Sequence, residues 1–423
     1  MTSGPPRGWM SSEKYTHDFV IAGAGIVGLC AAFEIKGRYP RARILILEKE
    51  PAPGLHASGR NSGVLHSGIY YTTDTLKARI CSAGAKRMRE FAAEYGIACE
   101  PRGKVILATC EEDLPAVERL MKNARENQLR AEILSEDGIR NIEPHARPYK
   151  TGVYTPDTAV IDSGGVVRKL FEILSGQGVE FCFNREIGAI DPVQKEVSAA
   201  GDVFKFGYFI NCAGAHADKL AACFGLGKKY ALLPFKGLYF KLRAERQFLV
   251  KSNIYPVPDL AMPFLGIHLT RVISGEVYLG PTAIPALGRE NYGLFEGINL
   301  QESFGILGRL LQMYWSDAHS FRNLVHREVL HYLKPYFVAA ARRLVPELRA
   351  EDLVPSGKVG IRPQLIRLAD KKLEMDFVIE QTPDSLHVLN AISPAFTSAF
   401  AFAALLADRI EQKEQRPAAE RKL

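Results

Sequence analysis

The chain has 423 residues, of which 47% are hydrophobic and 24% are charged, and its formal net charge at pH 7 is +7. This length and apolar fraction predict roughly two or three domain-sized units with a large packed core, and they exclude a disordered or low-complexity chain. The lysines and arginines are interleaved with acids along the chain. That pattern argues against nucleic-acid binding, so an anionic small-molecule substrate accounts better for the positive surplus.

Seven cysteines occur in the chain, and no two of them form a C-x-x-C pair. An odd number without such pairs predicts neither a disulfide framework nor a zinc or other metal site, and it favours a reducing compartment such as the cytoplasm. We find no apolar run of the roughly 18 residues that a membrane span needs. The N-terminal segment lacks the apolar core of a secretory signal, so we expect residues 1–15 and 416–423 to be flexible tails.

The first ordered segment predicts a strand, a tight turn, a helix and a second strand. Phe19 to Ala22 is a short apolar run typical of a buried parallel strand, and Gly28 to Lys36 has helical apolar spacing. A second apolar run, Ile44 to Leu47, ends at Glu48. Together these elements form a βαβ unit of about 30 residues.

A glycine fingerprint lies between this strand and helix. Gly23 permits the tight turn, Gly25 lets a pyrophosphate approach the backbone, and Gly28 lets the helix pack against the strand. The helix N-terminus supplies free N–H groups and partial positive charge to phosphates. The Glu48 carboxylate can accept hydrogen bonds from a ribose diol, which favours FAD or NAD over NADP. We therefore expect nucleotide contacts at Gly23, Gly25, Ile26, Val27, Gly28, Glu48 and Lys49.

The remaining chain continues in alternating helices and strands up to a different middle region. We predict helices at 76–95, 111–129, 163–174 and 396–409, and strands at 104–109, 179–183, 208–212 and 386–390. Asp162 is placed to cap the helix at 163–174. The middle region, about 230–323, is rich in prolines and aromatics and has short alternating runs, which predicts an antiparallel sheet.

These patterns predict an α/β fold, α+β overall, in which a second domain is inserted into a discontinuous Rossmann-like domain. We expect the nucleotide-binding domain at 16–95, 150–225 and 352–415. The substrate domain, built on an antiparallel sheet, is expected at 96–149 and 226–351. A ligand would then lie between the two domains.

The loop H-A-S-G-R-N-S-G-V-L-H-S-G-I-Y-Y, His56 to Tyr71, resembles the second flavin-contacting loop of D-amino-acid-oxidase-like FAD enzymes. More narrowly, the chain from Asp18 to about Asp408 resembles the L-2-hydroxyglutarate oxidases and dehydrogenases. The other matching segments are Ile254 to Arg271, L-G-P-T-A from Leu279, G-I-R-P-Q from Gly360 and N-A-I-S-P-A-F-T-S from Asn390. The resemblance implies an FAD enzyme that oxidises L-2-hydroxyglutarate to 2-oxoglutarate by hydride transfer to flavin N5.

The resemblance also implies roles for single residues. His66 is expected beside the flavin ring, where a neutral imidazole can accept the substrate hydroxyl proton. Arg362 is expected to bind the C1 carboxylate with its planar fork, with a surface or interdomain ion pair as the alternative. For the second carboxylate the candidates are Lys236, Tyr255 and His268. The family usually has arginine at the position of Lys236.

The flavin itself is expected to contact three further groups of residues. The implied contacts are Ser58, Arg60, Asn61, Ser62 and Gly63 in the second loop, Ile187, Ala213, Gly214 and Gly360 at strand ends or in strands, and Ser393, Pro394, Ala395, Phe396 and Thr397 before the last helix. That helix N-terminus can face the flavin where negative charge collects on reduction, while Ser393 or Thr397 can equally act as ordinary caps. Ile392 and Phe396 depart from the family pattern, and Phe396 can narrow the pocket.

Two other functions remain open from the sequence. One is an FAD oxidase or dehydrogenase of another small substrate, such as an amino acid or glycerol 3-phosphate. The other is a nucleotide-binding protein without catalysis. The electron acceptor can be oxygen, a quinone or a carrier protein. A quinone would require peripheral contact with a membrane, for which the partly apolar stretch 309–314 and the basic tail 416–422 are candidates, although solvated helix faces are the simpler interpretation.

Overall fold

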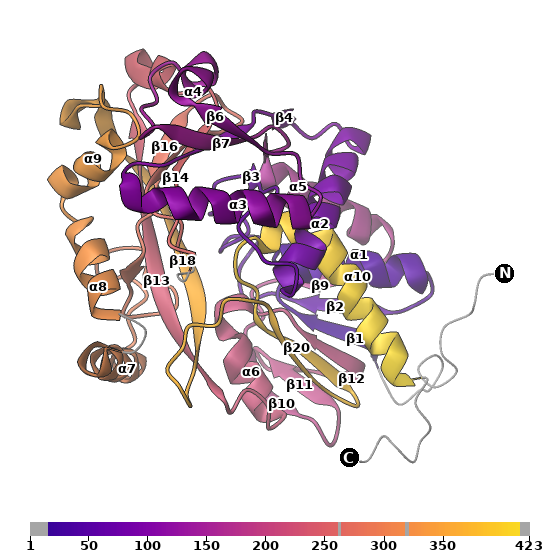
Figure 1. Cartoon of the computed structure of the whole chain (residues 1–423). Coiled ribbons are helices and arrows are strands. Elements are labelled where there is room, and N and C mark those ends of the chain that lie inside the picture. The colour runs from indigo at the N-terminus through magenta and orange to yellow at the C-terminus, as the bar shows by residue number, and fades with distance from the viewer. Residues whose placement is uncertain (1–15, 261–263, 318–320, 415–423) are drawn as a thin grey trace.

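Two large β-sheets and one small sheet organise the chain (Figure 1). The computed structural model describes residues 16–260, 264–317 and 321–414. The tails predicted at 1–15 and 416–423 lie outside the described residues. The α/β fold with more than one sheet agrees with the fold class predicted from the sequence.

The first large sheet has a parallel centre, as predicted from its apolar runs. Strand β1 pairs in parallel with β2 and with β12, and β12 pairs in parallel with β20. The strands of this sheet are β1 (His17–Ala22), β2 (Ile44–Leu47), β9 (Glu180–Cys182), β10 (Ile187–Asp191), β11 (Glu196–Ala199), β12 (Asp202–Asn211), β19 (Val378–Thr382) and β20 (Ser385–Asn390). All four residues of β2 are buried, which explains its uninterrupted apolar sequence.

Helices pack against this sheet, and the hydrophobic core lies between these helices and the strands. Helix α10 packs on both α1 and α2, and their apolar side chains join those of β1 and β2 in one cluster. The helices here are α1 (Ile26–Arg38), α2 (Leu76–Glu94), α5 (Ser163–Gly176), α6 (Ala217–Cys223) and α10 (Ala395–Glu414). The predicted cap of α5 is confirmed, because the Asp162 side chain accepts a hydrogen bond from Gly165 N. The predicted βαβ unit is confirmed as β1, α1 and β2.

The second large sheet is mostly antiparallel, as predicted for the middle region. Its strands are β5 (Lys104–Leu107), β6 (Glu132–Ser135), β7 (Thr151–Thr155), β13 (Tyr230–Leu242), β14 (Asn253–Pro256), β15 (His268–Arg271), β16 (Val277–Gly280), β17 (Ile284–Pro285) and β18 (Leu353–Arg367). The small third sheet holds β3 (Val64–Leu65), β4 (Cys99–Pro101) and β8 (Ala159–Ile161).

Two segments that we expected in the nucleotide-binding domain pair within the second sheet instead. Strand β18 pairs along its length with β13, and β7 pairs with β5 and β6. Strand pairing is decided by partners distant in sequence, so the local pattern of either segment carried no sign of it. The division of the chain into two domains stays a prediction, with these two segments now grouped with the second sheet.

The two faces of the second sheet differ in chemistry because side chains alternate along each strand. One face carries Val105, Ile254, Leu269 and Leu279, which pack with Phe337 in an apolar cluster. The strand register places a polar set on the opposite face: Lys104, Tyr255, His268, Tyr239 and Arg362. The sheet thus has an apolar side against helices and a polar side, which contributes to the cavity described below.

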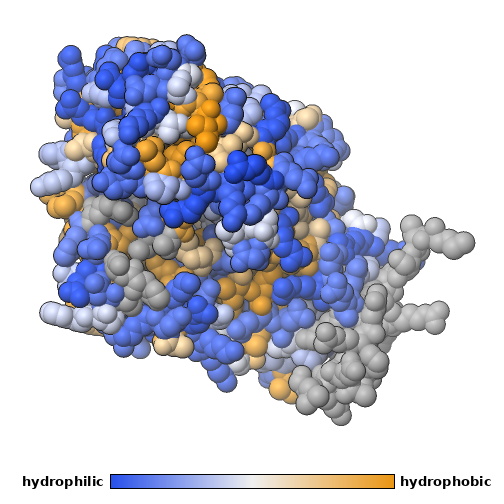
Figure 2. All heavy atoms as spheres, in the orientation of Figure 1, coloured by the Kyte–Doolittle hydropathy of each residue, from blue (hydrophilic) through white to orange (hydrophobic). Residues whose placement is uncertain are grey.

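Helices α3 (Leu114–Glu126), α4 (Glu136–Ile142), α7 (Leu300–Ser316), α8 (Phe321–Leu330) and α9 (Lys334–Arg342) surround the second sheet (Figure 1). Helix α7 lies in the middle region that predicts sheet, of which only the stretch 309–314 was interpreted as a helix face. Ile306 and Met313 are its buried apolar residues, whereas Leu300, Phe304 and Trp315 are exposed. Within the described residues, none of the helices combines the length and the apolar character that crossing a bilayer requires. Hydrophilic side chains cover most of the face in Figure 2, with apolar ones near its centre.

Candidate active site

A long cavity lies between the first sheet and the polar face of the second. It brings together most of the residues expected to hold a dinucleotide: Gly23, Gly25, Ile26, Val27, Glu48, Lys49, Ser58, Arg60, Asn61, Ser62, Ile187, Ala213, Gly214, Gly360, Ser393, Pro394, Ala395, Phe396 and Thr397. Gly28 and Gly63 do not line it. A Cβ on Gly28 would lie 2.1 Å from Gly23 O, and one on Gly63 would lie 2.7 Å from Ile161 O. Both glycines therefore serve close backbone packing.

The turn between β1 and α1 fits a diphosphate. Gly23 has a φ of +99°, and a Cβ there would lie 2.7 Å from Cys212 O. A Cβ on Gly25 would lie 3.2 Å from Ser58 Oγ, so the glycine keeps open a space that a side chain would fill. Gly25 is the N-cap of α1, and Gly25, Ile26 and Val27 line the cavity, so this helix N-terminus turns its partial positive charge toward it.

Glu48 lines the same cavity directly after β2. The residue is 8% exposed, and its carboxylate accepts hydrogen bonds from Ala24 N at 2.8 Å and Glu50 N at 3.0 Å. A carboxylate offers about four lone-pair sites, so acceptor capacity is left for a diol. The second loop closes against the turn, because Ile26 N donates to Ser58 Oγ at 2.9 Å.

His66 follows β3 and lies at the other end of the cavity. Its side chain is 9% exposed, and Nδ1 has no hydrogen-bond partner among the described residues. The backbone N–H of His66 donates to Thr397 Oγ1, whose hydroxyl in turn donates to Val64 O, so Thr397 joins α10 to β3. Burial, with the positive charges of Lys104 and Arg362 and a further contribution from His268, lowers the pKa of His66 to about 3. The imidazole is therefore neutral at pH 7 and available to accept a proton.

The polar face of the second sheet supplies the opposite wall. His268, Tyr255, Tyr239 and Arg362 all line the cavity. The His268 and Tyr255 rings stack with centroids 3.8 Å apart, and the Arg362 guanidinium lies 5.0 Å from the centre of the Phe264 ring. Burial lowers the pKa of His268 to about 3 and also lowers the pKa of Arg362. An anion entering this pocket would meet a buried cation in a region of low dielectric.

Lys236 is a predicted substrate ligand that the structure does not bring to the cavity. Lys236 pairs with Ile361, one position before Arg362, so its side chain alternates to the other face of the sheet. Its Nζ donates instead to Gly293 O at 2.7 Å. A cationic side chain in a family segment predicts a ligand, but the sequence does not show toward which face of the sheet that side chain points.

Sequence reasoning missed Glu328, a cavity residue on α8. It is 2% exposed, and its Oε2 accepts a hydrogen bond from Ala283 N at 3.1 Å. Its negative charge raises the pKa of Arg362 against the larger lowering by burial. No sequence signal distinguished this glutamate from the other charged residues of its helix.

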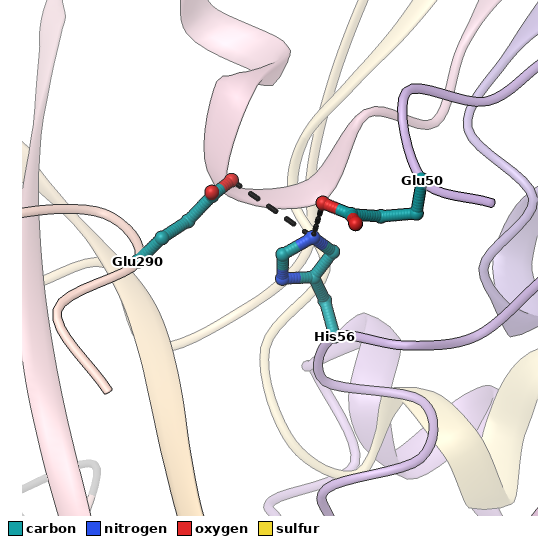
Figure 3. Close-up of side chains that lie close together, drawn as sticks. All are labelled: Glu50, His56 and Glu290. Carbon is teal, nitrogen blue, oxygen red and sulfur yellow. Dashed lines mark hydrogen bonds and ion pairs between the residues drawn. The ribbon is translucent and has the colours of Figure 1, made fainter. Parts of the chain in front are cut away.

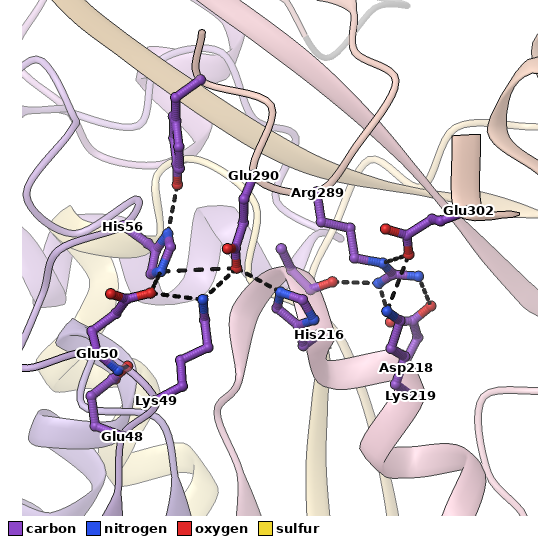
Figure 4. A network of polar contacts seen from close by, with 12 residues as sticks. Glu48, Lys49, Glu50, His56, His216, Asp218, Lys219, Arg289, Glu290 and Glu302 are labelled. Atoms are coloured by element: carbon purple, nitrogen blue, oxygen red, sulfur yellow. Dashed lines mark hydrogen bonds and ion pairs between the residues drawn. The ribbon is translucent and has the colours of Figure 1, made fainter. Parts of the chain in front are cut away.

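A segment between β17 and α7 crosses the dinucleotide end of the cavity, and we call its ionic contacts the clasp (Figure 4). Glu290 binds Lys49 Nζ at 2.6 Å and His216 Nε2 at 2.7 Å. These contacts, the His216 one first, lower the pKa of Glu290 to about 2, even though burial opposes them. Arg289 binds Asp218 at 2.9 Å and also pairs with Glu302. Ion pairs thus hold the segment to the residues after β2 and to the start of α6.

Glu50, His56 and Glu290 come close enough to hold a metal ion (Figure 3). Lys49 Nζ, however, lies 2.8 Å from Glu50 Oε1 and 2.6 Å from Glu290 Oε1. An ammonium group bonded to two of the three ligands competes directly with a cation. We therefore interpret the cluster as part of the clasp. The segment is further fixed by Tyr292, whose hydroxyl bonds to His56 at 2.7 Å and whose ring lies 4.1 Å from the Arg60 guanidinium.

Comparisons with known proteins point to one family. Residues 18–409 match the family model described as FAD dependent oxidoreductase, DAO. L-2-hydroxyglutarate dehydrogenase of Escherichia coli (strain K12) is 34% identical, with 93% of each chain covered. The mitochondrial L-2-hydroxyglutarate dehydrogenase of Caenorhabditis elegans is 33% identical, covering 96% of this chain and 95% of its own. The human mitochondrial protein of the same name is 32% identical, covering 97% and 93%.

Solved structures agree in fold. The dithionite-reduced L-alpha-glycerophosphate oxidase from Mycoplasma pneumoniae, which has FAD bound, superposes with a TM-score of 0.74 at 21% identity, covering 93% of this chain and 94% of its own. Glycine oxidase from Geobacillus kaustophilus gives 0.69 at 17% identity, covering 96% of each chain. At these identities the likeness supports the shared fold alone.

Proposed function

This chain belongs to the family of FAD-dependent oxidoreductases, and we propose that it oxidises L-2-hydroxyglutarate to 2-oxoglutarate. The observation that carries the proposal is one continuous cavity with a dinucleotide cradle at Gly23–Gly25 and a buried cationic pocket at its other end. His66 and Arg362 line that pocket. The names of the three relatives reported above supply the substrate.

His66 is proposed as the proton acceptor. When bound, FAD supplies the two-electron acceptor that takes the hydride from the alcohol carbon. The hydroxyl proton leaves to the neutral imidazole of His66, and the carbon–oxygen single bond becomes a carbonyl. The two carboxylates of the substrate also bring negative charge beside His66, which raises its pKa from about 3 and makes it a better base when substrate is bound.

Arg362 is proposed to bind the C1 carboxylate. Its planar fork can hold both carboxylate oxygens in parallel bonds, which fixes the direction of the C2–H bond. The second carboxylate then has Tyr255 and His268 as its candidate partners, since both line the same pocket. The buried surroundings also exclude water from the reacting atoms.

Anaerobic mixing of the FAD-loaded protein with L-2-hydroxyglutarate tests this function. We expect loss of the oxidised-flavin absorbance and formation of 2-oxoglutarate in equal amounts. The D-enantiomer, glycerol 3-phosphate and a small amino acid serve as comparison substrates. Faster bleaching by any of these than by L-2-hydroxyglutarate would overturn the substrate proposal while leaving the flavoenzyme family intact.

We also propose that the exposed side of α7 makes peripheral contact with a membrane, so that a quinone can accept the electrons. Leu300, Phe304 and Trp315 are 72%, 72% and 78% exposed, and the spacing puts them on one side of the helix.

Co-sedimentation of the holoprotein with anionic lipid vesicles tests the contact. We expect Phe304→Ser together with Trp315→Ser to abolish vesicle binding. Unchanged binding of this double variant would contradict the proposal. The basic tail at 416–422 lies outside the described residues.

A further inference from the structure

Lys104 is a buried lysine that the proposed chemistry does not use. It is the first residue of β5, is 0% exposed, and stands on the polar face of the second sheet. Among the described residues, Nζ has no hydrogen-bond partner, and no carboxylate forms an ion pair with it. A lysine that is fully buried without acceptors is rare, because transfer of its charge from water is strongly unfavourable.

Aromatic rings surround the amine and separate it from the cavity. Nζ lies 4.4 Å from the centre of the Tyr70 ring and 5.2 Å from that of Tyr255. Strand β14, which carries Tyr255, lies between β5 and β15, which carries His268. Tyr255 and His268 line the cavity, whereas Lys104 does not. Lys104 therefore stands one side chain behind the wall that substrate would touch.

The groups around Lys104 supply no negative charge at neutral pH. Those facing it are Tyr70, Tyr255 and Cys81, and the electrostatic partners across the pocket are His66 and His268. Burial raises the pKa of Tyr70 and Tyr255 and raises that of Cys81 to about 12, so all three stay neutral. Burial also lowers the pKa of Lys104 to about 7.

We propose that Lys104 is a positioning residue for the oxidation: behind Tyr255, it takes up a proton when a dicarboxylate binds in the cavity, and its charge then favours dianions over monoanions. This inference rests on the proposed function, because it concerns the second carboxylate of the same substrate. Arg362 can neutralise one carboxylate, and the ammonium of Lys104 offsets the second through the low-dielectric wall. A monoanion lacks the second carboxylate, so its binding would draw less proton uptake by Lys104.

Proton uptake on ligand binding tests the proposal without turnover. Glutarate, which has both carboxylates but no hydroxyl to oxidise, is titrated calorimetrically into the oxidised holoprotein at pH 7.5 in two buffers of different ionisation enthalpy. The wild type should take up more than about half a proton per glutarate, since binding raises the pKa of Lys104 from about 7. Lys104→Met should lose most of this proton uptake. Its affinity should fall about tenfold for glutarate but only about threefold for butyrate, which has a single carboxylate.

Lys36→Met is the matched control. Lys36 is also buried, but its Nζ donates to Ala42 O at 2.8 Å and Pro40 O at 3.2 Å in the first sheet region. This variant should keep the wild-type proton uptake and the wild-type preference for glutarate. Undiminished uptake in Lys104→Met would overturn the proposal, because the proton would then go to His66 or His268.

Thermal unfolding gives a readout that needs no substrate. Since the folded-state pKa of Lys104 lies near 7 and its ordinary value is 10.5, the unfolded chain holds more protons between these pH values, and the contribution of Lys104 to stability rises with pH there. The Tm of Lys104→Met should exceed that of the wild type at pH 7, and this difference should therefore shrink between pH 7 and 9. Parallel curves would overturn the role of Lys104 even if the substrate reduces the flavin. If the two Tm curves converge but L-2-hydroxyglutarate does not reduce the flavin, only the proposed function is overturned.

Discussion

The two ends of the cavity handle charge in opposite ways. At the dinucleotide end, the clasp joins Lys49, Glu290 and His216 in alternating ion pairs that are partly open to solvent. At the other end, His66, Arg362 and the acid Glu328 line the cavity, and the buried Lys104 stands behind Tyr255. Paired charges hold parts of the protein together, whereas an excess of one sign in a low-dielectric pocket is suited to a ligand of the opposite sign.

This difference predicts what substitutions will disturb. Changes at the buried end should affect the binding and oxidation of an anionic substrate with little effect on cofactor retention. Changes in the clasp should affect how long FAD stays bound, with little effect on chemistry once it is bound. Buried charges also carry larger energies than exposed pairs, so the effects should be larger at the buried end.

Arg362→Met should produce the largest loss. We expect kcat/KM for L-2-hydroxyglutarate to fall on the order of 1,000-fold, because a buried charge-assisted contact to the carboxylate is removed. Arg362→Lys should recover only part of this loss, since a single ammonium cannot reproduce the two parallel bonds. Rapid-mixing measurements of flavin reduction give the value, with flavin content as the control for folding. A loss below about tenfold would contradict direct carboxylate binding.

His66→Asn should slow flavin reduction by a factor on the order of 100 or more, with little change in substrate binding. The pH profile sharpens this test. Because the pKa of His66 in the free protein is lowered to about 3, the imidazole is already deprotonated above pH 5. The wild-type kcat/KM should therefore show no decline on acidification through pH 6.5. If the wild-type kcat/KM does decline below about pH 6.5 and His66→Asn lacks this decline, the pKa of His66 in the pocket would be near its ordinary value.

Glu290→Gln should release FAD about tenfold faster, because it removes the charge that holds Lys49 and His216 across the cavity. The recovery of free-flavin fluorescence after dilution measures this rate. Turnover at saturating FAD should stay unchanged. The matched control is Glu276→Gln, which breaks the Lys241–Glu276 pair at 2.9 Å away from the cavity and should leave the release rate as in wild type. Equal acceleration in both variants would mean that the clasp has no special role.

Ionic strength should have the smallest effect. The clasp residues are partly exposed, so raising salt from about 0.05 to about 0.5 M should speed FAD release by roughly two- to threefold through screening. The same change should be absent in Glu290→Gln, whose clasp charge is already gone. If salt speeds FAD release equally in Glu290→Gln, the salt effect would come from the contacts to the FAD pyrophosphate and not from the clasp.

Local pattern was sufficient wherever a function depends on neighbours in the chain. Gly23 and Gly25 were predictable because a strand, a glycine turn and a helix follow one another directly. The capping of α5 by Asp162 was predictable for the same reason. His66 was found through the family resemblance of its loop, and its position in the cavity agrees with that expectation.

Other parts of the site had weak or no local signal. Lys104 opens an apolar run, and a lysine in a buried strand is a sign of function that local reasoning can use. Glu328 and Glu290 lie among ordinary charged residues. Most of the middle region predicted sheet, and because only the stretch 309–314 was interpreted as a helix face, the full extent of α7 was not predicted.

By itself the sequence determined the glycine turn between a strand and a helix, the mixed α/β character and the presence of a mostly antiparallel second sheet. The tertiary structure decided which strands pair across that sheet, and thereby which side chains share its polar face. Lys236 and Arg362 show why: both are cationic, but the register of β13 against β18 turns one away from the cavity and the other into it. Side chains alternate with every residue, so only the pairing of distant strands determines what meets in the site.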